Sequence, residues 1–464
     1  MKQQAIKGFK VDFSDEPVTA WGGMVLAERL AARMGLWKVL GALLPAAKRS
    51  RYGSVEAVKA VVAGLLTGGQ GTFAAEGVRH DETLLKLLGL GGAPEEATVW
   101  RRCGAWGEEK AQEALASAQR QWVRRALVSM KRTDLLHRGF LPIFGDGSLL
   151  EGSRRREGTK TIPEKGAGLM WTTIFAGPML AAQRLAEADR GESADLRAML
   201  PDVLQDVVEP LKLKAKALLL MDSLHGDGPT LGEVEGLGIK YVVGANKLTQ
   251  TTKVLADQPE FAWHSTGARP EMKWSESAVC VCWIRCEGWE ANRLLVGRRW
   301  KREGEFVHQF GGVMTNLREA DVAHLTANPK AFARIVWELY DMKGALEIHY
   351  KEMLEDLGLH HPPCQKLADN RGFYAVATLA GALGRAVDLL GGKSDTRGAK
   401  KRKDGTPRKR ARPKTMRLWR LRRELFACPA RIATHARQAT VTILGLDAAV
   451  REQFEHFWRG VCRC

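Results

Sequence analysis

Two stretches decide the fold: FLPIFGD at residues 140–146 and KALLLMDS at residues 216–223. Each is a continuous apolar run that reaches an acid, Asp146 in the first and Asp222 in the second. Short apolar runs of this kind are typical of strands that are buried on both faces of a sheet. Side chains at the ends of such strands project into the crevice where α/β proteins bind ligands. The two acids are therefore candidates for a shared site.

The sequence around these runs continues the pattern of an α/β protein. GLMWTTIFAG (168–177), PMLAAQRL (178–185) and IKYVVGAN (239–246) predict further strands. LRAMLPDVLQDVVEPLK (196–212) predicts a helix that begins near Pro201, because proline suits the first turn of a helix. Strands that alternate with helices indicate a sheet covered on both faces.

The sequence predicts that the whole chain divides into five regions. Residues 1–135 read as an N-terminal helical DNA-binding region, and 136–249 as the first part of the α/β core. Residues 250–325 read as a β-rich insertion, and 326–391 as the second part of the core. Residues 392–464 predict a basic DNA-contacting segment, then a strand and a helix. Arg101 and Arg102, on a predicted helix of the first region, are candidate DNA contacts; an ordinary helical bundle with a solvated face fits equally well.

The charge points to a polyanionic partner. The 464 residues carry 71 Lys and Arg against 53 Asp and Glu, a net charge of +18. Residues 397–423 alone hold 14 basic residues and one acid. A nucleic acid is the commonest partner of such a surface, so we expect this segment to contact DNA. The candidate contacts are Lys400, Lys401, Arg402, Lys403, Arg408, Lys409 and Arg410.

The sequence also bears on the compartment. The N-terminus has no apolar core of signal-peptide length, and we expect no run of the roughly 20 apolar residues needed to cross a bilayer. The eight cysteines are scattered, as in reduced cytoplasmic proteins. These features predict a cytoplasmic, nucleoid-associated bacterial protein with no membrane partner.

A third acid stands on a predicted helix. In YDMKGALEIHYKE (340–352), Tyr340, Lys343, Glu347 and Lys351 are spaced 3, 4 and 4 residues apart and so share one helix face. A surface stripe of ion pairs would give the same spacing. The functional interpretation is a metal-binding glutamate flanked by phosphate-binding lysines.

Together these motifs resemble the DDE transposases of bacterial insertion sequences. GDGSLLEG (145–152), LLLMDSLHGDG (218–228), VMTNL (313–317) and the helix with Glu347 follow the family's order, and GVRHDETL (77–84) resembles its N-terminal region. The similarity covers roughly residues 20–450 and is greatest to the branch with a Tyr–Arg–Glu–Lys signature. In this chain Lys343 stands where that branch has arginine, and Leu354 where it has lysine, so that Lys351 is the nearest substitute.

The resemblance implies fold, chemistry and partners. It implies an RNase H-like core with a β-rich insertion before the last acid. Asp146, Asp222 and Glu347 would hold two Mg²⁺ or Mn²⁺ ions that promote DNA cleavage and strand transfer. Tyr340, Lys343 and Lys351 would contact DNA. The partners implied are transposon terminal inverted repeats and target DNA, bound by a homodimer.

Other interpretations stay open. The chain fits a catalytically silent DNA-binding protein of transposase descent, or another metal-dependent nuclease or phosphatase. Three cysteines of the insertion match no common zinc module, so we expect buried thiols there; they are Cys280, Cys282 and Cys286, with His264 or His308 as the nearest further ligands. Five tryptophans of the insertion predict packing rather than base stacking; they are Trp263, Trp274, Trp283, Trp289 and Trp300.

Overall fold

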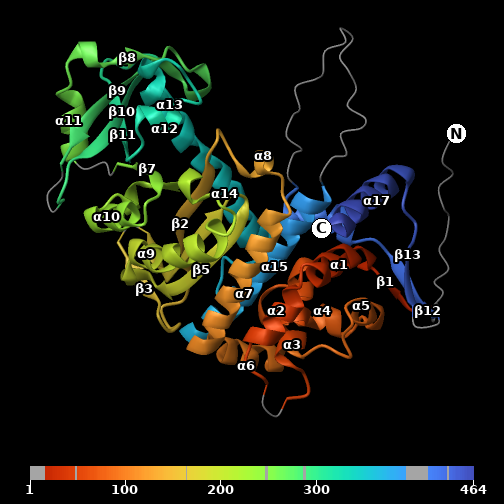
Figure 1. Cartoon of the computed structure of the whole chain (residues 1–464). Coiled ribbons are helices and arrows are strands. Elements are labelled where there is room, and N and C mark those ends of the chain that lie inside the picture. The colour runs from red at the N-terminus through yellow and green to blue at the C-terminus, as the bar shows by residue number, and fades with distance from the viewer. Residues whose placement is uncertain are drawn as a thin grey trace, which may run out of the picture.

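The structure, a computed structural model, describes residues 16–47, 50–163, 165–245, 249–285, 289–392, 416–435 and 438–464. It is a mixed α/β protein with one large mixed sheet (Figure 1). The strands are β1 (Val18–Thr19), β2 (Leu141–Glu151), β3 (Lys160–Ile162), β4 (Gly166–Ala176), β5 (Met179–Glu187), β6 (Ala217–Met221), β7 (Lys240–Gly244), β8 (His264–Ser265), β9 (Trp274–Ile284), β10 (Arg293–Arg302), β11 (Gln309–Thr315), β12 (Ala430–His435) and β13 (Gln438–Ile443).

Helices dominate the described chain before residue 136. They are α1 (Val25–Arg33), α2 (Leu36–Leu43), α3 (Ser54–Leu66), α4 (Glu76–Arg79), α5 (Glu82–Leu87), α6 (Glu96–Gly107), α7 (Glu109–Val128) and α8 (Arg132–Leu135). The later helices are α9 (Glu192–Val203), α10 (Gly228–Gly236), α11 (Thr249–Ala256), α12 (Glu319–Val322), α13 (Phe332–Tyr340), α14 (Gly344–Lys351), α15 (Leu367–Ala386), α16 (Leu418–Leu421) and α17 (Ala448–Arg463).

The centre of the sheet is built from β5, β4, β2, β6 and β7, in that spatial order. The pairs β5–β4 and β4–β2 are antiparallel, whereas β2–β6 and β6–β7 are parallel. Antiparallel neighbours need only short turns, and parallel neighbours need a crossover. Helix α9 lies in the connection from β5 to β6, and α10 lies in the connection from β6 to β7. All five residues of β6 are buried, as its apolar run predicts.

Helix α9 begins earlier than the sequence predicts. It starts at Glu192 and passes through Pro201, after which a π-helix (Leu204–Val208) follows. The expected start at Pro201 is therefore wrong. Leu196, Leu200 and Val203 are buried in the core. The free energy gained by burying these side chains outweighs the loss of the one backbone hydrogen bond that Pro201 cannot donate.

Helix α15 lies in the core between the helical region and the sheet. It packs against α3, α6, α7 and β5. With the π-helix that follows it, the span Leu367–Gly391 is long and apolar enough to cross a bilayer, contrary to the sequence expectation, but 94% of its apolar window is buried within the protein. The span is mostly apolar because protein covers nearly all of it.

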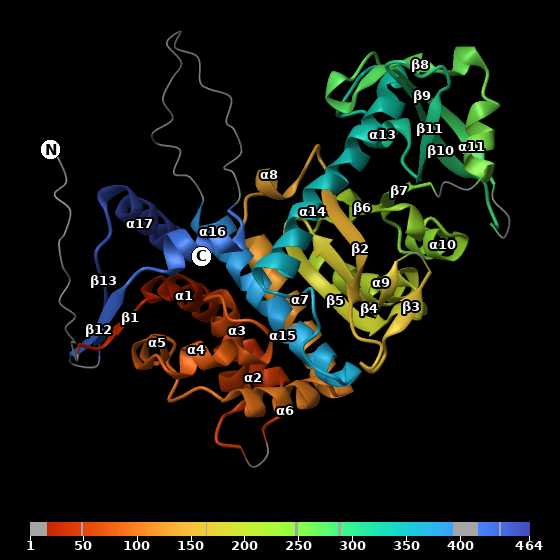
Figure 2. The ribbon, with the colours of Figure 1, turned by 180° about the vertical axis from the view of Figure 1, so that it is seen from behind.

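Strands β8 to β11 extend the same sheet. Strand β11 pairs antiparallel with β7, and β10, β9 and β8 follow outward. In both views this extension lies at the far end of the molecule from α1 to α6 (Figure 2). Helices α13 and α14 lead from the extension back toward β2 (Figure 2).

A second sheet joins the two ends of the described chain. Strand β1 pairs with β12, and β12 pairs with β13. The backbone amide of Gly22 also donates to the carbonyl of Cys428 at 2.7 Å. The described residues of the predicted N-terminal and C-terminal regions therefore share one sheet.

Candidate metal centre

Asp146 and Asp222 lie side by side on neighbouring parallel strands. The last register pair that joins β2 to β6 is Phe144 with Leu220, and each acid follows two residues later. Asp222 comes directly after β6, as the sequence predicts. Asp146 does not end its strand, because β2 continues to Glu151 in a hairpin with β4. Both acids thus stand at the level where β2 and β6 separate.

Two glycines allow a helix to approach Asp146 closely. A Cβ atom at Gly145 would lie 2.1 Å from a methyl carbon of Leu196, and one at Gly147 would lie 2.5 Å from the carboxyl carbon of Glu192. A larger residue at either position would force the Leu196 or Glu192 side chain to move from its place beside β2. The sequence GDG therefore brings the first residue of α9, Glu192, to the site.

Glu192 is a site residue that the sequence analysis missed. Its side chain is 9% exposed, and it is the first helical residue after Gly191. The predicted start of the helix at Pro201 left Glu192 outside the predicted helix. The signal that identifies it is the glycine before it together with the apolar spacing of Leu196, Leu200 and Val203, which extends the helix backward.

His225 completes a compact group of ligand atoms. One ligand atom each from Asp146, Glu192 and His225 lies within 4.8 Å of the others. The imidazole is fully buried, and its Nδ1 atom lies 3.1 Å from the Ser193 hydroxyl. Its Nε2 atom lies 3.7 Å from Glu192 Oε2 and 3.8 Å from Asp222 Oδ1. The imidazole therefore faces three carboxylates.

Lys343 is the cation closest to the two aspartates among the ion pairs of the described chain. Its Nζ atom lies 3.6 Å from Asp146 Oδ2 and 3.9 Å from Asp222 Oδ2. Tyr340 lies one turn before it, and its hydroxyl oxygen lies 2.6 Å from where a Cβ atom of Gly244 would be. The structure therefore brings Tyr340 and Lys343 to the aspartates.

Burial and mutual repulsion work against full ionisation of the acids. Burial raises the pKa of Asp146; Lys343 lowers it and Asp222 raises it again. Burial also raises the pKa of Glu192 to about 6, with Lys165 opposing this shift and Asp222 and Asp146 adding to it. Burial lowers the pKa of His225. A group of acids held in this state gains from a nearby cation.

Glu347 belongs to helix α14, but its side chain lies outside the described part of the structure. The helix itself is fixed to the site through Tyr350. The Tyr350 hydroxyl donates to the backbone carbonyls of Asp146 at 3.0 Å and Trp171 at 3.2 Å, and it accepts from Thr173 at 3.0 Å. The backbone that carries Glu347 is therefore anchored to β2 and β4.

The remaining predicted DNA contacts lie apart from this group or outside the described residues. Lys351 is exposed on α14. Arg101 is exposed on α6, whereas Arg102 is half-buried and donates to the carbonyl of Tyr52 at 2.7 Å. Lys400, Lys401, Arg402, Lys403, Arg408, Lys409 and Arg410 all lie outside the described residues, as does Cys286.

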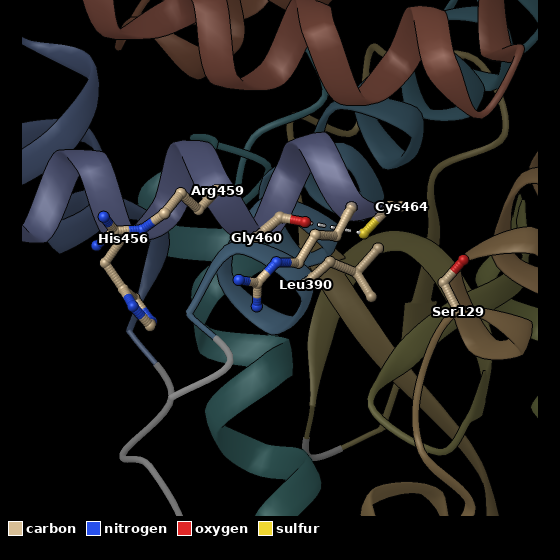
Figure 3. Close-up of a pocket in the computed structure, with 7 residues that line it drawn as sticks. Ser129, Leu390, His456, Arg459, Gly460 and Cys464 are labelled. Carbon is tan, nitrogen blue, oxygen red and sulfur yellow. Dashed lines mark hydrogen bonds between the residues drawn. The ribbon is translucent and has the colours of Figure 1, made fainter. Parts of the chain in front are cut away.

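A separate pocket of about 210 Å³ lies beside α17 (Figure 3). His456, Arg459 and Arg463 line it from α17, and Leu390 and Ser129 line it from neighbouring elements. It shares no residue with the group around Asp146, so it does not form part of that site.

Comparison with known proteins leaves the function to the geometry. No protein family and no curated protein sequence matches the chain. Among solved structures, it is similar to a piggyBac transposase, determined by cryo-electron microscopy as a synaptic complex with hairpin DNA. The TM-score is 0.37 and the identity 9%, over 78% of this chain and 73% of that one. A likeness this distant does not decide what this chain does.

Proposed function

We propose that the protein is a DDE-type DNA transposase that cuts and rejoins DNA at the ends of an insertion sequence. One observation carries this proposal. Asp146 and Asp222 stand at the same level on adjacent parallel strands, and both lie within 4 Å of one lysine. Carboxylates arranged in this way suit hard divalent cations and phosphate chemistry.

The topology supports an RNase H-like core. The order β5-β4-β2-β6-β7, with β4 antiparallel to both neighbours and β6 and β7 parallel to β2, is the arrangement of strands in that fold. The β-rich extension enters after β7 and returns through α13 to α14, which is where the resemblance requires an insertion before the last acid. The extension is continuous with the core sheet rather than a separate unit.

The donor atoms of the site fit divalent metal. Within the described residues, Glu192 Oε2 and His225 Nε2 are buried and have no hydrogen-bond partner. Buried polar atoms are rarely left in this state unless an ion or water satisfies them. We propose two Mg²⁺ or Mn²⁺ ions, held by Asp146, Asp222 and Glu347. When bound, such ions supply a lowered pKa for a coordinated water and positive charge at the scissile phosphate.

The other residues of the site act on DNA and on geometry. Lys343 places a point charge beside both aspartates, suited to an anionic phosphate. Tyr340 and Lys351 lie before and after Lys343 in the helical stretch from α13 to α14. They would contact the DNA strand on either side of that phosphate. Tyr350 positions the backbone of Asp146 through its hydroxyl.

The proposed partner is DNA, both as terminal repeats and as target. The net charge of +18 and the 14 basic residues of 397–423 supply the attraction. Further proposals are a homodimer on DNA and a location in the bacterial cytoplasm at the nucleoid.

Lys343 also favours a second candidate, a silent DNA-binding protein of transposase descent. An ammonium group between two acids neutralises them much as a metal ion would. A chain in which lysine has taken over that role would bind DNA without cutting it.

Strand nicking separates the two candidates. The substrate is labelled DNA taken from either side of the gene, incubated with and without Mg²⁺, and a gel-shift is run on the same DNA. The transposase nicks only with metal. Asp146→Asn, Asp222→Asn and Glu347→Gln each abolish nicking and leave DNA binding intact, because each removes a negative ligand. Glu151→Gln, at the exposed end of β2, is the matched control and nicks normally.

Binding without nicking by the wild-type protein would establish the silent alternative. Nicking at the wild-type rate by any of the three variants would remove that residue from the metal site.

A further inference from the structure

Three segments far apart in the sequence deliver ligand atoms to one point. Asp146 comes from the middle of β2, Glu192 from the first turn of α9, and His225 from the 3-10 turn Ser223–His225 after β6. One atom from each lies within 4.8 Å of the other two. This group differs from the Asp146, Asp222 and Glu347 set, because it adds a nitrogen donor and a carboxylate from a different helix.

The second observation is the state of the two added residues. His225 is completely buried, and its Nε2 atom, which has no hydrogen-bond partner in the described structure, points at the carboxylates. Glu192 Oε2 is buried and likewise unpartnered within those residues. The 3.7 Å between these two atoms is too long for a hydrogen bond. An ion between them would satisfy both atoms at once.

The surroundings leave Glu192 Oε2 and His225 Nε2 available to an ion. Lys165 Nζ lies 3.9 Å from the other oxygen of Glu192, Oε1. The Gly147 amide donates to Asp146 Oδ1 at 3.0 Å. On the far side of the imidazole, Nδ1 lies 3.1 Å from the Ser193 hydroxyl. When Nδ1 carries the proton and donates it to Ser193, Nε2 keeps its lone pair toward the carboxylates, as in the second shell of metal-bound histidines.

We infer that Asp146, Glu192 and His225 form one of the metal positions, and that its imidazole nitrogen makes this position select Mn²⁺ over Mg²⁺. Mg²⁺ is a hard cation that takes oxygen ligands, whereas Mn²⁺ is the weakest member of the first-row series of metals, which also bind sites with nitrogen donors. The inference deepens the proposed function by naming the ligands and the preferred ion. It rests on that proposal only for the presence of metal at the site.

Metal binding without DNA tests the inference separately from cleavage. Mn²⁺ is titrated into the metal-free full-length protein, and free Mn²⁺ is followed by electron paramagnetic resonance, with Mg²⁺ as the competitor. Many sites bind Mn²⁺ more tightly than Mg²⁺, so the informative quantity is the change in the Mn²⁺/Mg²⁺ affinity ratio between variants. His225→Asn, which removes the imidazole nitrogen from this position, lowers this ratio at least tenfold. Glu192→Gln weakens both ions at least tenfold and leaves the ratio unchanged.

Two controls accompany these variants. Glu151→Gln removes an exposed acid of β2 and leaves both affinities as they are. His324→Asn removes a histidine that pairs with the Arg138 carbonyl, away from the site, and leaves the ratio as it is.

A spectroscopic measurement on the wild-type protein needs no substitution. Electron spin-echo envelope modulation of bound Mn²⁺ shows the ¹⁴N coupling of a coordinated imidazole, and His225→Asn removes it. An absent ¹⁴N coupling in the wild type, or an unchanged affinity ratio in a folded His225→Asn protein, overturns the inference. Nitrogen-coordinated Mn²⁺ in a protein that does not cut DNA would uphold the inference and reject the proposed function.

Discussion

The hydroxyl of Tyr350 donates a hydrogen bond to the backbone carbonyl of Asp146, 204 residues earlier in the chain. This contact joins the helix of Glu347 to the strand of the first acid. The tyrosine is buried at its hydroxyl, where Thr173 and Trp171 complete its hydrogen bonds. The Tyr350 hydroxyl therefore contributes a direct polar contact between α14 and β2, beside the packing of its ring on Trp171 and Phe175.

Removing that hydroxyl tests its role. Tyr350→Phe leaves the Asp146 carbonyl with one partner fewer in a buried place, which costs about 1–3 kcal/mol of unfolding free energy. We expect Mg²⁺-dependent nicking to fall more than tenfold, because α14 and β2 lose their alignment. DNA binding in a gel-shift stays near the wild-type level.

Tyr374→Phe is the matched control for this variant. The Tyr374 hydroxyl is also buried and also donates to a backbone carbonyl, that of Leu359, away from the acids. It should lose similar stability and keep its nicking rate. Equal losses of nicking in both variants would mean that Tyr350 acts through stability alone.

Replacing Lys343 should raise metal affinity and lower the rate of nicking. Lys343→Met removes a positive charge that lies 3.6 Å from Asp146 and competes with metal for it. Metal affinity, measured by calorimetry without DNA, therefore rises severalfold, since like charges repel across a few ångströms. Nicking falls, because the phosphate loses its cation.

Lys351→Met, on the exposed face of α14, is the comparison. It leaves metal affinity unchanged and weakens DNA binding slightly. Weaker metal binding in Lys343→Met would show that the lysine supports the metal site rather than competing with it.

Asp388 predicts a pH dependence of stability away from the metal site. Burial raises its pKa from 3.8 to about 6, against the lowering effects of Arg385 and the Met416 amide. Between these pH values the folded protein retains a proton that the unfolded chain has lost. Asp388 therefore reduces stability as pH rises from about 4 to about 6, by about 3 kcal/mol at most.

Thermal melts of the metal-free protein measure this effect. The stability of Asp388→Asn relative to wild type rises with pH through the same window. Glu355 supplies the opposite case, since a hydrogen bond from Arg417 holds its pKa below the usual value. The relative stability of Glu355→Gln falls as pH rises. A constant difference between Asp388→Asn and wild type would contradict the shift.

The basic segment gives a prediction from charge alone. Replacing Lys400, Lys401, Arg402 and Lys403 by glutamine removes up to four phosphate contacts. The slope of log affinity against log salt then becomes shallower by up to about 3.6, at roughly 0.9 for each contact. The loss is the same for terminal-repeat and unrelated DNA. An unaltered slope would mean that these residues do not touch phosphate.

Much of the central sheet can be read from the sequence because its signals are local. The apolar runs of β2, β6 and β7 mark buried strands, and the acids after them fall at one level because parallel strands keep register. The apolar runs of β4 and β5, which are adjacent in the sequence and pair with each other, are local in the same way.

The missed features depend on long-range packing. The sequence around Glu192 indicates that it lies on a helix, but it does not show that Gly145 and Gly147 of a distant strand leave room for that helix beside Asp146. Two other acids near the motifs are structural. Asp227 caps α10 by accepting from Thr230, and Glu352 is buried beside Arg385 and accepts from the Leu418 amide. Because both have structural roles, neither is a neutral control for substitutions of the proposed metal-binding acids, although both look like surface acids in the sequence.

Strand β7 connects the core of the sheet to its extension. One edge pairs with β6 beside Asp222, and the other pairs with β11 of the extension through Val242, Val243 and Gly244. The extension is therefore joined to the core sheet by the backbone hydrogen bonds of β7. The last residue of β7, Gly244, pairs with Val313 of the extension. On its other side it lies against Ser223 and the Tyr340 hydroxyl. A partner that binds the extension would therefore act on the strand whose last residue lies beside the candidate metal site.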